Sequence, residues 1–290
     1  MRSSSGLPPG GPPLAETLAR AEAVILPRPL SESAGELSLP PGTRLRVGVD
    51  LGTAYLVLVV LDEAGVPLAG EWQFAEVVRD GLVVDFVGAT DRLRGMKSRL
   101  ERRLGRELSL AGSAYPPGVP PVEVAATSHV LEAAGFECSG LIDEPSAANL
   151  LLQLREGALV DVGGGTTGIA VVREGRVVYT ADEPTGGVHF TLVVAGSLGL
   201  SFEEAEALKT NPAEQARLLP LLRPVMEKVG AIILRHVRRR RVKELTLVGG
   251  TASFQGMPQV IQEYTGLPTQ VPARPLFVTP LGIALNSPPQ

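Results

Sequence analysis

Two pairs of short apolar runs stand out along this chain, and a small segment rich in glycine and threonine separates the two runs of each pair. The first pair lies within 45–61 and the second within 158–172. Each pair ends in a polar turn that contains glycine, at 62–65 and at 173–175. Short apolar runs bounded by turn residues are typical of buried β-strands. The pattern therefore predicts a β-hairpin in each half of the chain, built on the same plan.

Between and after the predicted hairpins, apolar residues recur at helical spacing. In 90–108 they share one face: Leu93, Met96, Leu100 and Leu104. An amphipathic helix is therefore predicted there, with its arginines in solvent. Further helices are predicted at 14–26, 122–134, from about 146, and at 188–198, 202–209 and 218–239, and further strands at 66–78, 82–86, 138–142 and 244–248.

The composition is that of a globular chain with room for two domains. It has 290 residues, of which 44% are hydrophobic, and a net charge of −4. That charge argues against a general affinity for nucleic acid or anionic membranes. The single cysteine, Cys138, excludes an internal disulfide and fits a reducing compartment, and its apolar surroundings favour an inert thiol. No apolar run approaches the ~20 residues of a transmembrane helix, and 1–13 lacks the apolar core of a secretion signal, so a cytoplasmic protein is expected.

Each predicted hairpin carries an acidic residue just before its turn, Asp50 in the first and Asp161 in the second. Glycine lets backbone N–H groups approach an anion closely, and the hydroxyl groups of Thr53, Thr166 and Thr167 can donate to phosphate oxygens. A polyphosphate also brings a hard cation, which keeps water ligands and prefers carboxylate oxygens. Two such turns facing each other would clamp the phosphates of a nucleotide. One glycine-rich turn alone would be weak evidence, and the duplication strengthens it.

The two turns, with the aspartates that precede them, resemble the phosphate-one and phosphate-two motifs of the actin-like ATPases. Three further segments occur in the matching order: 141–148 resembles the first connecting motif, 247–252 the adenosine motif and 279–284 the second connecting motif. This group includes actin, sugar kinases, the seventy-kilodalton heat-shock chaperones, and bacterial cytoskeletal and pilus-assembly proteins. The ordered motifs span 44–286 and make the resemblance specific.

The resemblance implies an α/β protein with the actin-like ATPase fold, in which two RNase H-like domains have a nucleotide cleft between them. The first domain is expected at 44–156 and the second at 157–290, after an N-terminal extension at 1–43. The stretch between Gly187 and Leu247 leaves little room for the lobe that many relatives place above the adenine, so that subdomain is expected to be reduced. The C-terminal helix can pack back on the first domain. ATP and Mg²⁺ are the implied cofactors.

The motif positions also imply the site residues. Those expected to contact the nucleotide are Gly52, Thr53, Ala54, Tyr55, Gly163, Gly164, Gly165, Thr166, Thr167, Glu206, Lys209, Gly249, Gly250 and Thr251. Asp50 and Asp161 are expected to hold Mg²⁺ and to take part in catalysis. At Glu144 the family places a carboxylate that positions or activates the attacking water, and the structural alternative is a helix cap. Glu206 and Lys209 match the place where relatives hold the ribose or the adenine edge, with an exposed ion pair as an equal alternative.

One departure from the family pattern concerns the rate of hydrolysis. Many relatives have an acidic residue directly after the second turn, where this chain has Gly168. A carboxylate that could assist the cation is missing there, so slow hydrolysis is expected, and a non-hydrolysing, nucleotide-bound scaffold is the alternative. A small-molecule kinase would need a polar acceptor pocket that the sequence does not show clearly. Activases of radical dehydratases need a cysteine-ligated cluster, which Cys138 alone does not supply.

Within this group the chain resembles the ethanolamine-utilisation protein J family, on the segments 80–89, 186–193 and 201–209. That family is chaperone-like and associated with bacterial microcompartments. The resemblance implies a protein partner, such as a microcompartment enzyme or shell protein, and it allows a homo-oligomer. It also offers a second interpretation of the helix at 14–26, as the targeting peptide of a microcompartment cargo, although packing on its own domain is favoured.

Three further features are interpreted structurally. The arginine-rich run 235–241 ends a long predicted helix, where cations face the negative end of the helix dipole, and this interpretation is favoured over nucleic-acid binding. His129 and His189 have no acidic, cysteine or histidine neighbour at ligand spacing. No metal or nucleophilic role is expected for them.

Overall fold

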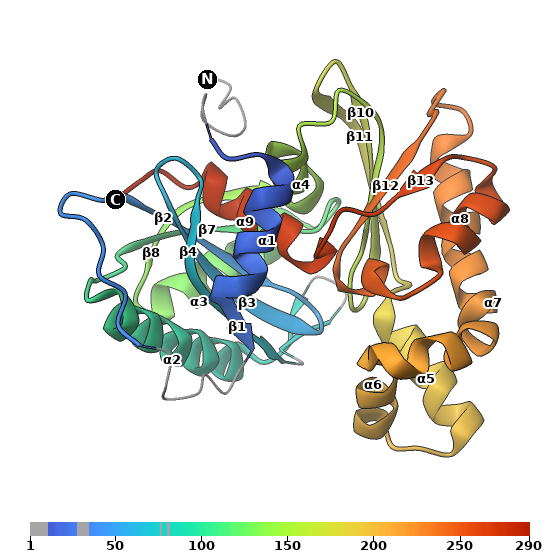
Figure 1. Cartoon of the computed structure of the whole chain (residues 1–290), viewed down its shortest axis with the longest axis horizontal. Coiled ribbons are helices and arrows are strands. Elements are labelled where there is room, and N and C mark those ends of the chain that lie inside the picture. Colours follow the sequence, from blue (N-terminus) through green and yellow to red (C-terminus); the bar gives the residue numbers. More distant parts are fainter. Residues whose placement is uncertain (1–10, 28–34, 76, 80–81) are drawn as a thin grey trace. The chain divides into compact units, whose positions relative to one another are not determined.

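The computed structural model describes residues 11–27, 35–75, 77–79 and 82–290. The chain folds into two compact units (Figure 1): 1–153 together with 277–290 form the first, and 154–276 form the second. The first two residues of the segment 80–89 lie outside the described residues. Each unit has one main sheet with helices packed on it, so the predicted α/β class is confirmed.

The first unit is built on a six-stranded sheet with the order β1-β4-β3-β2-β7-β8. Its strands are β1 (Ile25–Pro27), β2 (Leu45–Leu51), β3 (Tyr55–Asp62), β4 (Pro67–Phe74), β7 (Leu110–Tyr115) and β8 (Glu137–Asp143). β2, β3 and β4 pair antiparallel, whereas β1 with β4, β2 with β7, and β7 with β8 are parallel. A small separate sheet, β5 (Val78–Arg79) with β6 (Leu82–Val83), follows β4. The first predicted hairpin, β2–β3, is thereby confirmed.

Helices cover both faces of this sheet: α1 (Leu14–Val24), α2 (Phe86–Leu104), α3 (Pro121–Ala133), α4 (Glu144–Leu152) and α9 (Val278–Asn286). Alternate residues of β2 point to opposite faces of the sheet, so they contact the helices on the two sides in turn. Val47 and Val49 belong to the core that includes residues of α2 and α3. Gly48 lies against α9 instead, so closely that a Cβ there would be 2.6 Å from the backbone nitrogen of Ala284. A larger residue at this position would separate α9 from the sheet.

Helix α2 follows the predicted apolar face. Its buried residues include Leu93, Met96, Leu100 and Leu104. The helix begins earlier than predicted, at Phe86, because the carboxylate of Asp85 accepts a hydrogen bond from the backbone N–H of Gly88 (2.8 Å) and so caps the first turn. It ends at Leu104, and the next residue, Gly105, caps it in the left-handed conformation with φ 61°.

The N-terminal helix packs on its own unit, which confirms the favoured interpretation of the segment 14–26. Leu18 and Ala21 of α1 are buried, with 1% and 0% exposure. Residues 25–27 leave the helix and form β1, which pairs parallel with β4 at the edge of the sheet. This part of the extension therefore belongs to the first folded unit.

The second unit has a five-stranded sheet with the order β11-β10-β9-β12-β13. Its strands are β9 (Glu156–Val162), β10 (Thr167–Arg173), β11 (Arg176–Glu183), β12 (Leu245–Val248) and β13 (Thr269–Gln270). Its helices are α5 (Gly187–Leu198), α6 (Phe202–Thr210), α7 (Pro212–Val237) and α8 (Met257–Thr265), with the short 3₁₀ helices η1 (Gly250–Ser253) and η2 (Pro275–Phe277). β9, β10 and β11 are antiparallel, and β12 runs parallel to both β9 and β13. One apolar core joins α5, α6, α7 and α8 to the sheet.

Helix α7 begins earlier than the apolar pattern predicted. Pro212 occupies its first turn, where a missing N–H costs nothing, and the side chain of Asn211 caps it. Pro220 and Pro224 lie inside the helix on its exposed side, where the carbonyl groups that lose a partner can bind water.

The same helix ends within the arginine-rich run 235–241, at Val237, so the predicted position of this run at a helix end is confirmed. Arg235 donates from Nη1 to Oε1 of Glu183 (2.9 Å), which neutralises part of the run. Across the residues that the structure describes, no helix is both long enough and apolar enough to span a bilayer.

Candidate functional site

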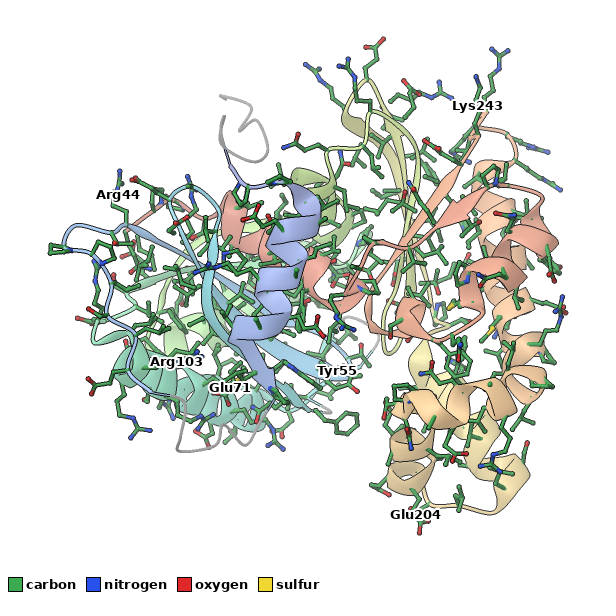
Figure 2. All side chains as sticks on the ribbon, viewed as in Figure 1. Arg44, Tyr55, Glu71, Arg103, Glu204 and Lys243 are labelled. Atoms are coloured by element: carbon green, nitrogen blue, oxygen red, sulfur yellow. The ribbon has the colours of Figure 1, made fainter. Side chains whose placement is uncertain are left out.

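The first glycine-rich turn joins β2 to β3 in the first unit. The N–H of Gly52 closes it by donating to the carbonyl oxygen of Tyr55 (3.0 Å). Tyr55, labelled in Figure 2, meets the ring of Trp72 edge to face, with the ring centroids 5.2 Å apart. Because Trp72 belongs to β4, the end of the turn is fixed to the neighbouring strand. Asp50 lies near the end of β2 and is half-buried.

The second turn, between β9 and β10, repeats the geometry of the first. The N–H of Gly163 closes it by donating to the carbonyl oxygen of Thr166 (3.1 Å). The strand pairs that flank the two turns are Leu51–Leu56 and Val162–Thr167, so the turns have the same length. Asp161 precedes this turn as Asp50 precedes the first, and it is also half-buried. The second predicted hairpin is therefore confirmed, and the sequence repeat is a repeat of structure.

The N-terminus of α5 binds the carbonyl groups of the second turn. The N–H of Gly187 donates to the oxygen of Gly163 (2.9 Å), and that of Val188 to the oxygen of Gly164 (2.7 Å). In a trans peptide the C=O of one residue and the N–H of the next point in opposite directions. The N–H groups of Gly164 and Gly165 therefore point away from α5. Successive N–H groups that point to the same side can bind an anion. Gly164 is half-buried and Gly165 is buried, so Gly164 is the more accessible of these two residues.

One of the threonines expected to donate to phosphate has another role. The hydroxyl of Thr167 donates to the carbonyl oxygen of Thr185 (2.5 Å), and Thr167 is completely buried. A hydroxyl has one proton, so Thr167 cannot donate to a phosphate while this bond is made. Thr53 and Thr166 are half-buried and remain the candidate hydroxyl donors.

The adenosine motif lies directly against the second turn. Gly249 has φ 87°, and a Cβ there would be 2.3 Å from Oδ1 of Asp161, so only glycine fits. Gly250 begins η1, and the hydroxyl of Thr251 donates to the carbonyl oxygen of Gly163 (2.8 Å). Asp161, Gly163, Gly249, Gly250 and Thr251, all predicted site residues, thus come together in one unit.

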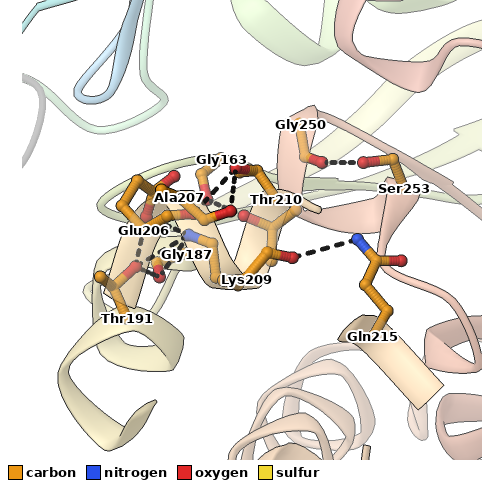
Figure 3. Close-up of polar contacts among 11 residues, drawn as sticks. Gly163, Gly187, Thr191, Glu206, Ala207, Lys209, Thr210, Gln215, Gly250 and Ser253 are labelled. Carbon is orange, nitrogen blue, oxygen red and sulfur yellow. Dashed lines mark hydrogen bonds and ion pairs between the residues drawn. The ribbon is translucent and has the colours of Figure 1, made fainter. Parts of the chain in front are cut away.

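Glu206 and Lys209 form an ion pair, with 2.6 Å between Oε2 and Nζ (Figure 3). The predicted alternative was an exposed pair, but Lys209 retains only 9% exposure. Its Nζ also donates to the hydroxyl oxygen of Thr191 (2.8 Å) and to the carbonyl oxygen of Gly187 (3.1 Å). Burial lowers the pKa of Lys209, and the charge and hydrogen bond of Glu206 oppose that shift. Thr191 was not among the predicted site residues, because it meets Lys209 only through the packing of α5 on α6.

Glu144 opens α4 in the first unit, directly after β8. The helix cap is its neighbour Asp143, whose Oδ1 accepts from the N–H of Ser146 (3.0 Å), so the capping alternative for Glu144 does not apply. α4 is fixed against α9, since a Cβ at Gly282 would come 1.8 Å from the carbonyl oxygen of Ala147. The two connecting motifs therefore pack directly on each other.

The position that lacks the expected acid has a carboxylate beside it on the next strand. Gly168 of β10 pairs with Asp161 of β9 on one side and with Asp182 of β11 on the other. A Cβ at Gly168 would lie 3.6 Å from Oδ1 of Asp182 and 3.8 Å from Cβ of Asp161. Asp182 was not predicted, because its pairing with Gly168 depends on a bulge between Val171 and Val172, which shifts the register that the turn between β10 and β11 sets.

The remaining candidate groups have structural partners. Nδ1 of His189 accepts from the N–H of Gly186 (3.3 Å) at the start of α5. The expectation that His129 has no acidic neighbour is wrong, because its Nδ1 lies 3.3 Å from Oε2 of Glu132, three residues further along α3 and on the surface. Burial raises the pKa of the Cys138 thiol, which lowers its reactivity as expected. Within 11–27, 35–75, 77–79 and 82–290, no three His, Cys, Asp or Glu side chains gather as a metal-binding group.

Comparison with known proteins identifies the class of fold to which this chain belongs. Residues 128–278 match the family of the Type IV pilus assembly protein PilM. The crystal structure of MreB5 of Spiroplasma citri bound to AMPPNP is similar in fold, with a TM-score of 0.64 at 18% identity over 83% of this chain and 95% of that one. Together with the duplicated hairpins and the two sheets, these matches define a protein of the actin-like ATPase fold, as the motifs implied.

Two closer relatives assign the family. The ethanolamine utilization protein EutJ of Escherichia coli is 43% identical over 241 residues, which cover 83% of this chain and 85% of the relative. The crystal structure of EutJ from Carboxydothermus hydrogenoformans has a TM-score of 0.85 at 43% identity and covers 94% of this chain and 98% of that one. The chain belongs to the EutJ family, and the resemblance seen in the sequence is confirmed.

Proposed function

We propose that this protein binds ATP with Mg²⁺ and acts in ethanolamine utilisation as a nucleotide-dependent, chaperone-like protein. The observation that carries the proposal is the construction of the second turn. α5 and Thr251 bind its carbonyl groups, so that the N–H groups of Gly164 and Gly165 are turned the other way. The same unit holds the adenosine motif against Asp161. A phosphate-binding backbone and a nucleoside-binding glycine segment side by side favour a nucleotide over a simple anion.

The donor set fits magnesium. Mg²⁺ keeps several water ligands and usually takes one or two carboxylates together with phosphate oxygens, so it needs no cage of three or more protein ligands. Asp50 and Asp161 are half-buried at the ends of their strands and would hold the ion, directly or through water. The bound ion would neutralise charge on the phosphates. Glu144 would position the attacking water.

The family supports a role with a protein partner. EutJ is an ethanolamine utilization protein by name, and PilM is a pilus assembly protein. We propose that the partner is a microcompartment enzyme or shell protein in the cytoplasm, bound differently in the presence and absence of nucleotide. Couplings of this kind are typically 1–3 kcal/mol, so a roughly 5- to 150-fold difference in partner affinity is expected. Titration calorimetry with a purified shell protein, with and without Mg-ATP, measures it, and equal affinities would contradict the chaperone-like cycle.

Thermal unfolding with Mg-ATP tests nucleotide binding itself. At a hundredfold excess over the dissociation constant, the ligand should stabilise the fold by about 2.7 kcal/mol. Asp161→Asn keeps the shape of the side chain and should remove most of this stabilisation. Asp91→Asn, at an exposed aspartate on α2, is the matched control and should keep it. An unchanged melting temperature of the unaltered protein at millimolar Mg-ATP would contradict the proposal.

A non-hydrolysing scaffold is the second candidate, favoured by the glycine at position 168. The position of Asp182 argues against a non-hydrolysing scaffold, because its carboxylate lies next to Gly168, where many relatives have the acidic residue. Glu144→Gln separates the two candidates, provided that binding and phosphate release are measured on the same sample. If Glu144 positions the water, the variant should bind ATP normally and release phosphate more slowly. A scaffold should show no release above background in either form.

A further inference from the structure

Exposed cations gather at the end of the second unit that lies away from the second turn. β9, β11 and β12 run in one direction and β10 in the other, so the first three begin, and β10 ends, at the same edge of the sheet. The second turn follows β9 and therefore lies at the opposite edge. Two of the cations come from the β10–β11 hairpin and four from the segment between α7 and β12, and we call them the cationic end: Arg173, Arg176, Arg238, Arg239, Arg241 and Lys243. Lys243 is labelled in Figure 2.

Contacts of Arg240 join these two segments into one surface. Nη2 of Arg173 donates to the carbonyl oxygen of Arg240 (2.6 Å), across 67 positions of sequence. The guanidinium of Arg240 lies over the ring of Tyr179 on β11, with 3.4 Å between Cζ and the ring centroid, and its Nη1 donates to the carbonyl oxygen of His236 (2.6 Å). A cation over an aromatic face is attracted by the quadrupole of the ring. The turn after α7 is therefore fixed against the hairpin.

The helix dipole does not account for so many cations. The C-terminus of a helix carries about half of one negative charge, and its effect falls off within the last turn. Arg235 and His236 already occupy that turn of α7. Among the side chains that the structure describes, no carboxylate forms an ion pair with the cationic end, so the mutual repulsion of its charges is not relieved. Arg241 also has φ 51°, a left-handed conformation that glycine adopts more easily. These costs favour a role outside the fold.

The charges around the cationic end favour an acidic protein segment over a nucleic acid. Three exposed carboxylates stand among the cations: Glu156, Glu174 and Glu244. They would repel an unbroken row of phosphates, whereas separate acidic side chains can lie between them. The ring of Tyr179 is covered by Arg240, so it is closed to stacking by a base. Guanidinium groups bind carboxylates through two parallel hydrogen bonds, which fixes the direction of the contact as well as its charge.

We propose that the cationic end is a docking surface for an acidic segment of the partner protein. The inference rests on the proposed protein partner, to which it gives a surface and a chemistry, and it does not depend on nucleotide binding. The seven residues of β9 separate this surface from the second turn by about 20 Å, so both sites can be occupied at once. The docking should weaken as the salt concentration rises, because exposed charges are screened.

Fluorescence anisotropy of a fluorescein-labelled peptide of alternating glutamate and alanine tests the proposal on the full chain. The double variant Arg239→Glu with Arg241→Glu should weaken peptide binding at least about fourfold, because two surface ion pairs are lost and two repulsions replace them. Arg92→Glu with Arg102→Glu is the matched control: it changes the net charge equally at two exposed arginines of α2, and affinity should stay within about twofold. Both double variants should bind a fluorescent ADP analogue as the unaltered protein does.

A second variant of the same surface keeps the test valid if the first lowers the melting temperature. Arg176→Glu with Lys243→Glu changes one cation in each of the two segments and should weaken the peptide in the same way. Equal weakening by the variant on α2 would show a general effect of net charge and would overturn the inference. The inference would also fail if single-stranded DNA or phosphatidylserine vesicles bound the cationic end more tightly than the peptide, or if the surface joined two copies of this chain in sedimentation experiments.

The two ligands also separate this inference from the nucleotide proposal. If the ADP analogue did not bind while the peptide bound at the cationic end, the nucleotide function would fail and the docking surface would stand. If the ADP analogue bound but the peptide did not, the docking surface alone would be excluded.

Discussion

The two glycine-rich turns have the same length and the same closing hydrogen bond, but they are supported differently. In the first, the carbonyl of Ala54 accepts from the N–H of Ala75, directly after β4, and the rings of Trp72 and Phe74 in β4 pack edge to face on Tyr55. In the second, the carbonyl of Gly163 accepts from both α5 and η1, and Lys209 fixes α5 in turn. The local sequence forms the turn, whereas more distant elements orient it. If the second turn binds phosphate as proposed, its N–H groups are oriented by these more distant elements.

Gly249→Ala is the substitution that we expect to disturb the second turn most. The added Cβ would lie 2.3 Å from Oδ1 of Asp161 and 2.5 Å from the carbonyl oxygen of Val162, at a residue with φ 87°. Overpacking and left-handed strain together should cost about 3 kcal/mol or more, and nucleotide binding should be lost. Gly266→Ala is the control: its φ is 69° but no atom lies within 4 Å, so only about 1 kcal/mol is expected. Urea unfolding measures both, and equal losses would show that the contact with Asp161 does not matter.

A matched pair of substitutions tests the two turns at equivalent positions. A Cβ at Gly52 would be 2.8 Å from the carbonyl oxygen of Tyr55, whereas a Cβ at Gly163 would be 3.6 Å from that of Thr166. Gly52→Ala should therefore destabilise the protein by about 1–3 kcal/mol, and Gly163→Ala by less than about 1 kcal/mol. Chemical denaturation of the two variants gives the difference. A larger loss at Gly163 would mean that the second turn is the more tightly packed of the two.

This contrast also shows which features of the structure could be predicted from the sequence. The two hairpins follow from apolar runs that act locally, and α2 follows from one apolar face, so both could be predicted. The hydrogen bond from Thr251 to Gly163 joins residues 88 positions apart, and nothing local marks either as a partner of the other. The burial of Lys209 depends likewise on how α5 packs on α6. The sequence could therefore indicate which residues belong to the second turn and the segments beside it, but not which groups their side chains contact.

Asp182 offers a test of the cation side of the second turn. If its carboxylate stands in for the acid missing at Gly168, Asp182→Asn should weaken the Mg²⁺ dependence of ATP binding, with a several-fold higher Mg²⁺ concentration at half-saturation. The affinity for ATP in the presence of EDTA should stay the same. Glu174→Gln, at the exposed turn between β10 and β11, controls for the loss of one negative charge on the same hairpin. Magnesium titrations followed by the fluorescent ADP analogue decide the question, and identical curves for both variants would exclude Asp182 from the cation site.

The smallest expected effect concerns α6, the helix that carries Glu206 and Lys209 to the second turn. The backbone N–H and the hydroxyl of Ser201 hold the pKa of Glu204, labelled in Figure 2, below its usual 4.5. A carboxylate with a depressed pKa in the folded state adds stability above pH 4.5 and loses it as the pH falls through the folded value. Glu204→Gln should therefore melt slightly lower than the unaltered protein at neutral pH, and the gap should close in acid. Glu203→Gln removes an equally exposed charge from the same helical turn without removing the cap, so it separates the hydrogen bond from the helix dipole. If the two variants followed the same course from pH 7 to pH 3, the cap of Glu204 would contribute nothing beyond its charge.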